Sequence, residues 1–166
     1  YCDQFGLGRP LGMDYPNESA CNIPNSVYYD KIYPRNLGSW KSPTIMSVGI
    51  GQGETQLTTI QMANLAACIA NRGYWYPPHL VKAFTDGTPI PSKYRQKQQV
   101  NIDRHNFELA VEGMEQCVIR GTARIAQVPG IAVCGKTGTS QNPHGEDHSV
   151  FFAFAPKDNP KIAIAV

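Results

Sequence analysis

The sequence lacks a marked excess of charge of either sign, and it lacks a long apolar run. Its 166 residues include 15 Lys and Arg against 13 Asp and Glu, a formal net charge of +2. Nucleic-acid binding through phosphates needs clustered Lys and Arg, so this balance argues against such a role and we expect no nucleic-acid partner. The longest apolar stretches, around residues 60–70 and 150–156, fall short of the roughly 18 to 20 residues that a bilayer-crossing helix needs.

The sequence also lacks a cysteine pattern typical of a disulfide framework or a zinc site. Five cysteines are present, and no two of them form a Cys-x-x-Cys pair. Cys68, Cys117 and Cys134 lie in apolar patterns where small buried thiols are common. Taken alone, the cysteines indicate a reducing compartment. We expect neither a structural metal nor a cofactor.

Two segments have the pattern of helices. Residues 58–71 begin at an N-cap threonine, Thr58 or Thr59, and stop at Gly73. This segment is apolar nearly all round, which predicts a buried helix. Residues 103–120 follow Asp103 as an N-cap and carry apolar residues three and four positions apart, which predicts a second helix with one buried face.

The last third of the chain changes to the pattern of strands. Residues 131–139, 149–155 and 161–166 are rich in β-branched and aromatic residues, and short polar loops join them. Short connections favour antiparallel neighbours. We also expect a short strand at residues 79–84, whereas the Pro- and Gly-rich residues before Gly53 predict a long loop that covers something else. The predicted fold class is α+β, with helices packed on an antiparallel sheet.

The tetrapeptide Lys136-Thr137-Gly138-Thr139 ends the first of these strands and carries the most chemistry. On a strand, Thr137 and Thr139 point to one face, so two hydroxyls can meet one carboxylate. Gly138 lets the backbone of a ligand lie against the strand, and Lys136 adds a cation that can reach an anionic group. This combination suits a strand edge that holds the C-terminal carboxylate of a peptide. The alternative is a solvated lysine before a turn, and so short a motif also recurs by chance.

Further blocks around this motif make the sequence resemble the penicillin-binding transpeptidases, especially the elongation-type class B group. They occur in the order typical of that family across almost the whole chain. The matching blocks are Phe5-Gly6-Leu7-Gly8, Leu11 to Glu18, Ser47 to Gly53, Thr58 to Gly73 with Pro78-His79-Leu80-Val81, Gly121-Thr122-Ala123, Gly135 to Thr139, Asp147-His148 through Phe154-Ala155-Pro156, and Asn159-Pro160.

The resemblance implies a serine acyl-transfer enzyme that acts on the D-Ala-D-Ala stem peptides of peptidoglycan and is intercepted by β-lactam antibiotics. It implies that the hydroxyls of Thr137 and Thr139 hold the substrate carboxylate. The backbone N–H of Thr139 would be one oxyanion donor, and Lys136 would steer the carboxylate and assist proton transfer. It also implies a location in the periplasm or on the extracytoplasmic face of the cytoplasmic membrane, and partners among other cell-wall elongation proteins that bind through parts outside this chain. These implications outweigh the reducing compartment that the cysteines indicate.

The sequence departs from the family pattern at the nucleophile. No Ser or Thr has a Lys three residues later, so the nucleophilic Ser-x-x-Lys is missing. Ser140-Gln141-Asn142 resembles the second motif, Ser-x-Asn, but it directly follows Lys-Thr-Gly-Thr instead of preceding it at a distance. We interpret residues 1–166 as the C-terminal part of one transpeptidase domain, with both motifs expected before Tyr1 and a membrane anchor in a segment outside this chain. We expect the chain alone to be inactive.

Three other features have competing interpretations. Gln52 matches a groove-lining position in the family, but it is equally a polar residue in a Gly turn. Thr122 faces the cleft in one interpretation and caps a helix end in the other. His144, Glu146, Asp147 and His148 suggest a metal cluster, although a polar loop between strands explains their spacing better.

Two rival functions share the expected fold. The first is a non-catalytic β-lactam sensor or receptor domain, which a signalling membrane segment would distinguish. The second is a hydrolytic relative, either a D,D-carboxypeptidase or a β-lactamase. The blocks Leu11 to Glu18 and Ser47 to Gly53 argue against hydrolysis.

Overall fold

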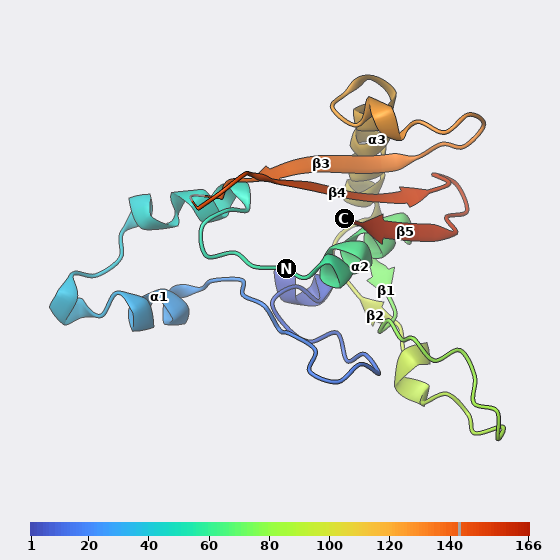
Figure 1. Cartoon of the computed structure of the whole chain (residues 1–166), viewed down its shortest axis with the longest axis horizontal. Helices are drawn as coiled ribbons and strands as arrows, with labels where there is room; N and C mark the ends of the chain where they lie inside the picture. The colour runs from blue at the N-terminus through green and yellow to red at the C-terminus, as the bar shows by residue number, and fades with distance from the viewer. Residues whose placement is uncertain (143) are drawn as a thin grey trace.

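The C-terminal part of the chain forms a three-stranded antiparallel sheet (Figure 1). The computed structural model describes residues 1–142 and 144–166. The strands are β3 (Cys134–Ser140), β4 (His148–Ala155) and β5 (Ile162–Ala165), in the spatial order β3-β4-β5. β3 is therefore an edge strand, paired with β4 on one side only.

Two helices pack on one face of this sheet. α2 (Thr59–Ala70) lies against β4 and β5, and α3 (Arg104–Arg120) lies against β3. The helices and strands meet in a buried cluster of Ala70, Val111, Met114, Cys134 and Phe154. Since side chains alternate along a strand, Cys134 and Phe154, which pair in register, face this core together.

The opposite face of the sheet carries the alternate set of residues, and its part around β5 and the end of β4 is apolar. Ile162 and Ile164 remain 59% and 43% exposed there. A shallow apolar hollow of about 210 Å³ lies on this face, lined by Ala126, Val128, Val133, Phe151, Ala153, Phe154, Ala155, Ile162 and Ile164. α2 and α3 contact the other face, and none of the residues that line this hollow belongs to either helix.

A second core joins the start of the chain to the outer side of α2. The short helix η1 (Cys2–Phe5) and the two-stranded sheet of β1 (Tyr74–Trp75) and β2 (Gln98–Gln99) surround it. Its buried members are Leu11, Cys68, Trp75, Val100 and Phe107.

The region that was predicted as a long loop holds several short helices. They are α1 (Ser26–Ile32), η2 (Arg35–Leu37) and η3 (Ser42–Ile50), which follow one another along one side of the molecule in Figure 1. Two further short 3₁₀ helices are η4 (Ser92–Arg95) and η5 (Arg124–Ala126). Among the described residues, no helix is both long enough and apolar enough to cross a membrane.

The main helices and the three C-terminal strands confirm the predicted α+β class, but the strand at residues 79–84 was wrong. The backbone N–H groups of Leu80 and Val81 donate to the Asp14 carboxylate at 2.8 and 2.9 Å. Because a side chain satisfies these amides, the segment does not pair with a strand.

Candidate functional site

The outer edge of β3 is met by side chains instead of a further strand. The Lys136 Nζ donates to the Thr137 carbonyl oxygen at 2.6 Å, and the Gln52 Nε2 donates to the Thr139 carbonyl oxygen at 3.4 Å. Both contacts are exposed to solvent. An extended ligand can exchange with such contacts and add to the sheet through main-chain hydrogen bonds.

Thr137 and Thr139 lie on the same face of β3, the face opposite α2 and α3. They pair in register with Phe151 and Ser149 of β4. Thr137 is half-buried and Thr139 is exposed. The structure therefore presents two hydroxyls on one side of an open strand edge, as the alternation of the strand predicted.

Thr122 lies beside this pair, although it is fifteen positions away from Thr137 in the sequence. Its Oγ1 is 2.6 Å from the Thr137 Oγ1. The chain leaves α3 at Gly121, where an added Cβ would lie only 2.8 Å from the Cys117 backbone. A glycine at this turn thus brings Thr122 back against β3, so Thr122 faces the strand.

Cys117 is a neighbour of this group that the sequence did not single out. Its Sγ lies 3.6 Å from the Thr122 Oγ1. Burial raises the pKa of the Cys117 thiol. Hydrogen bonds with the Thr122 side chain and with the Thr137 and Ala123 backbones, together with the Lys136 charge, outweigh this effect and leave the pKa below its ordinary value. Its position in the sequence, one helical turn before Gly121-Thr122, is the signal that could have placed Cys117 near Thr122.

Gln52 approaches β3 from the turn that follows η3. Gly51 and Gly53 flank it with positive φ angles of 76° and 68°, so the turn depends on glycine on both sides. A hollow of about 370 Å³ lies between this turn and the end of β3. Its lining residues are Ile50, Gly51, Gln52, Thr55, Gln56, Leu57, Met62, Gly138, Thr139, Ser140 and Val150.

The two glycines of β3 differ in what surrounds them. A Cβ on Gly135 would lie 2.6 Å from the Phe151 ring, so an aromatic side chain occupies the space above that glycine. A Cβ on Gly138 would meet only the Val150 Cβ, at an ordinary 3.7 Å. The fold therefore requires a glycine at position 135 but leaves room for a side chain at position 138.

Lys136 begins on the face covered by the helices, because it pairs with Phe152, and its Nζ reaches the strand edge at the Thr137 carbonyl. It is exposed. The four residues of the tetrapeptide, Gln52 and Thr122 thus gather around one strand edge.

Three of the four residues that suggested a metal cluster lie in the polar loop between β3 and β4, and His148 is the first residue of β4. The Asp147 Oδ1 accepts a hydrogen bond from the Asn142 backbone N–H at 3.0 Å. Within residues 1–142 and 144–166, no three His, Cys, Asp or Glu side chains are placed to bind one metal ion. Asp147 thus has a role within the loop itself.

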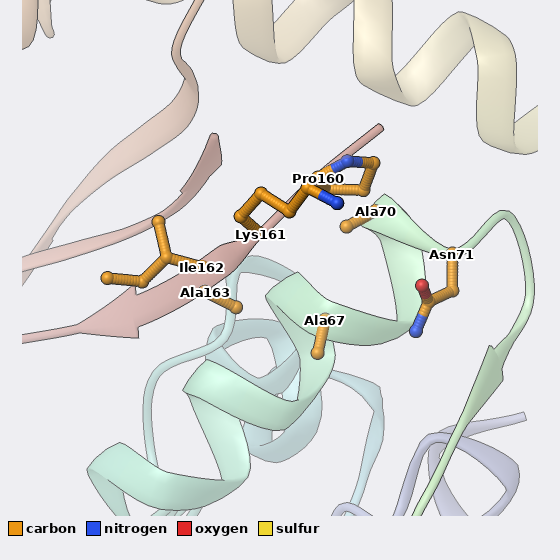
Figure 2. A pocket seen from close by; sticks show the side chains of 7 residues that line it. All are labelled: Ala67, Ala70, Asn71, Pro160, Lys161, Ile162 and Ala163. Atoms are coloured by element: carbon orange, nitrogen blue, oxygen red, sulfur yellow. The ribbon is translucent and has the colours of Figure 1, made fainter. Parts of the chain in front are cut away.

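A separate hollow of about 170 Å³ lies where the end of α2 meets the start of β5 (Figure 2). Alanine, proline and isoleucine side chains line most of it. The two lining residues with polar side-chain groups are Asn71 and Lys161. It lies on another part of the sheet from Thr139, and most of its lining side chains have no group that could act in catalysis or bind a polar ligand.

An α+β domain whose exposed edge strand carries Lys-Thr-Gly-Thr defines the class of serine transpeptidases and β-lactamases. The family model described as the penicillin binding protein transpeptidase domain matches residues 1–166. The chain belongs to this family, and the predicted family and fold are confirmed.

Relatives with known names support the same assignment. The chain is 32% identical to the peptidoglycan D,D-transpeptidase MrdA of Acinetobacter baumannii and 34% identical to that of Haemophilus influenzae, over 98% of its own length in both cases. The structure of Pseudomonas aeruginosa PBP2, solved in complex with WCK 5153, superposes with a TM-score of 0.80 at 31% identity. This match covers 98% of the chain and 35% of the solved structure. The chain spans about a quarter of the two curated relatives, 26% and 28% of their lengths.

Proposed function

We propose that this chain is the C-terminal, carboxylate-binding part of a peptidoglycan D,D-transpeptidase. The observation that carries the proposal is the free edge of β3, where Thr137 and Thr139 offer hydroxyls on one face beside exposed carbonyls. An acyl-D-Ala-D-Ala terminus is an extended peptide that ends in a carboxylate, and it matches both features. The named relatives at 32% and 34% identity support the same activity.

In this proposal each residue of the edge has one task. The ligand lies along β3, and its carboxylate accepts hydrogen bonds from the Thr137 and Thr139 hydroxyls. The exposed ammonium of Lys136 attracts the carboxylate. The Thr139 backbone N–H then donates to the oxygen of the carbonyl under attack, where negative charge develops. Gln52 and Thr122 line the two sides of the ligand.

The nucleophile of this reaction is not in the chain, because no Ser-x-x-Lys occurs in it. We infer that the longer protein supplies the serine, its activating base and a membrane anchor, and that it works on the extracytoplasmic side of the membrane. β-Lactams would acylate that serine while their carboxylate occupies the threonine site. Contacts with other cell-wall elongation proteins would involve parts outside this chain.

The test measures acylation by a fluorescent penicillin in the complete protein that carries this chain. Thr139→Val and Thr137→Val each remove a hydroxyl from the carboxylate site, and we expect the second-order acylation rate to fall roughly tenfold or more. Thr85→Val, on an exposed loop, is the matched control and should leave the rate unchanged.

Two outcomes would contradict the proposal. One is a complete protein that penicillin does not acylate, and the other is an equal rate for all three valine variants. Mass spectrometry of the 166-residue chain alone gives a further check. The isolated chain should not gain the mass of a bound penicillin, because it lacks the serine.

A further inference from the structure

Three side chains lie in a row that ends at the carboxylate site. Cys117 projects from α3 toward Thr122, with 3.6 Å between Sγ and Oγ1, and Thr122 contacts Thr137, with 2.6 Å between the two Oγ1 atoms. The backbone holds the row in place, because the N–H groups of Gly121 and Ala123 both donate to the Cys117 carbonyl at 3.1 Å. Thr137 is the last member before the open strand edge.

Each hydroxyl in this row has only one hydrogen, and this limits which atom donates in each of its hydrogen bonds. A threonine hydroxyl has one hydrogen to donate, and a carboxylate can only accept. If Thr137 donates to a carboxylate, its oxygen must accept from Thr122 across the 2.6 Å contact. Thr122 has then used its own hydrogen, so it can accept from Cys117 but cannot donate to it.

We propose that Cys117 is a positioning residue for the carboxylate site, because its thiol donates to Thr122 and so leaves the Thr137 hydrogen free for the ligand. This inference rests on the proposed function, since it assumes that Thr137 binds a carboxylate. Cys117 does not touch the ligand and acts through Thr122.

The reverse direction of the row would oppose binding. If Thr122 donated to the sulfur, Thr137 would donate to Thr122 and turn a lone pair toward the carboxylate. A neutral thiol is a weak acceptor, so it competes poorly for the Thr122 hydrogen.

The test compares acylation of the complete protein by benzylpenicillin and by its methyl ester, which lacks the carboxylate. Cys117→Ala removes the donor, and we expect the rate with the free acid to fall about 3- to 10-fold. The rate with the ester should stay the same. Cys117→Ser keeps a donor at this position and should restore the rate with the acid. Cys21→Ala is the matched control, because Cys21 Sγ also lies near a hydroxyl, 3.5 Å from Ser19 Oγ, outside the site.

A second pair of variants tests whether Cys117 acts through its neighbour. Thr122→Val removes the middle hydroxyl, so adding Cys117→Ala to Thr122→Val should cause no further loss. If Cys117→Ala alone does not fold, Thr122→Val still tests the row, because it should lower the rate with the acid more than the rate with the ester.

The possible failures can be told apart. If penicillin does not acylate the wild-type protein, the proposed function is wrong and the inference falls with it. If the wild type is acylated and Cys117→Ala matches it with the acid, the inference is wrong and the proposed function stands. Equal losses with acid and ester would show that Cys117 has only a structural role, and would also overturn the inference.

Discussion

At the scale of single residues, the two glycines of β3 have different explanations: packing explains Gly135, and a bound ligand would explain Gly138. Phe151 lies over Gly135, and an added Cβ there would come within 2.6 Å of its ring. Gly138 has open space, with its first contact at 3.7 Å. The absence of a side chain at position 138 therefore has no packing explanation within the described residues, and a ligand that approaches the strand closely would explain it.

We predict opposite results for alanine at these two positions. Gly135→Ala should lower the free energy of unfolding by about 1 to 3 kcal/mol, because the new methyl group overpacks a site that Phe151 fills. Gly138→Ala should change it by less than about 0.5 kcal/mol. Urea denaturation monitored by circular dichroism measures both. An unfolding free energy that falls equally in the two variants would contradict the difference.

At the scale of elements, the buried side of α2 carries two amide side chains, Gln61 and Asn64. Gln61 is fully buried, and its Nε2 donates to the carbonyls of Arg9 and Ala20 at 2.9 and 3.1 Å. Its Oε1 accepts from the N-cap Thr58 at 3.1 Å, which completes a capping box. A helix that looks apolar in sequence thus fixes the start of the chain through polar contacts.

The segment that follows β1 is held by a comparable contact from Asp14. Hydrogen bonds from the Leu80 and Val81 backbones lower the pKa of Asp14 below its ordinary 3.8. A lowered pKa means that the contact stabilises the charged form, so its contribution is complete above about pH 4 and is lost as the pH falls through the lower folded-state pKa.

We predict that the amide chemical shifts of Leu80 and Val81 report this titration. They should stay constant from neutral pH downward and change together with a midpoint below 3.8. Asp14→Asn should remove the transition, because an amide does not titrate in this range. A midpoint above 3.8 would mean that the carboxylate is not held by these backbone groups.

Elements that depend on a local sequence pattern were predicted from the sequence. Features that depend on contacts between residues far apart in the chain were not. The cap at Thr58 and the strand alternation around Thr137 are local signals, and both were confirmed. Residues 79–84 do not form the predicted strand, because the backbone at Leu80 and Val81 bonds to Asp14, which is more than sixty positions away. Cys117 was missed for the same reason, since its place beside Thr137 follows from how α3 packs on β3.

At the scale of the whole molecule, the two faces of the sheet are unequal. α2 and α3 bury one face, while the other leaves Ile162 and Ile164 largely exposed around an apolar hollow of about 210 Å³. Contiguous exposed apolar surface of this kind marks a site of contact or a cause of aggregation.

We predict that the isolated chain binds a hydrophobic dye at this face. The double variant Ile162→Ser with Ile164→Ser should lower the fluorescence of bound dye and reduce self-association in analytical ultracentrifugation. Leu109→Ser is the control, because Leu109 on α3 is 56% exposed but lies away from the hollow. Equal dye binding by both variants would place the dye elsewhere on the chain.

The contact between Gln52 and the Thr139 carbonyl has a thermodynamic consequence for any peptide that extends the sheet. Where an incoming N–H replaces the Gln52 amide at that oxygen, one hydrogen bond is exchanged for another. Such an exchange changes the enthalpy little, because the oxygen has a partner before and after. Selectivity at this edge is therefore expected to come from the charged end of the peptide, and peptides that share a backbone but differ in their last group should bind with very different affinities.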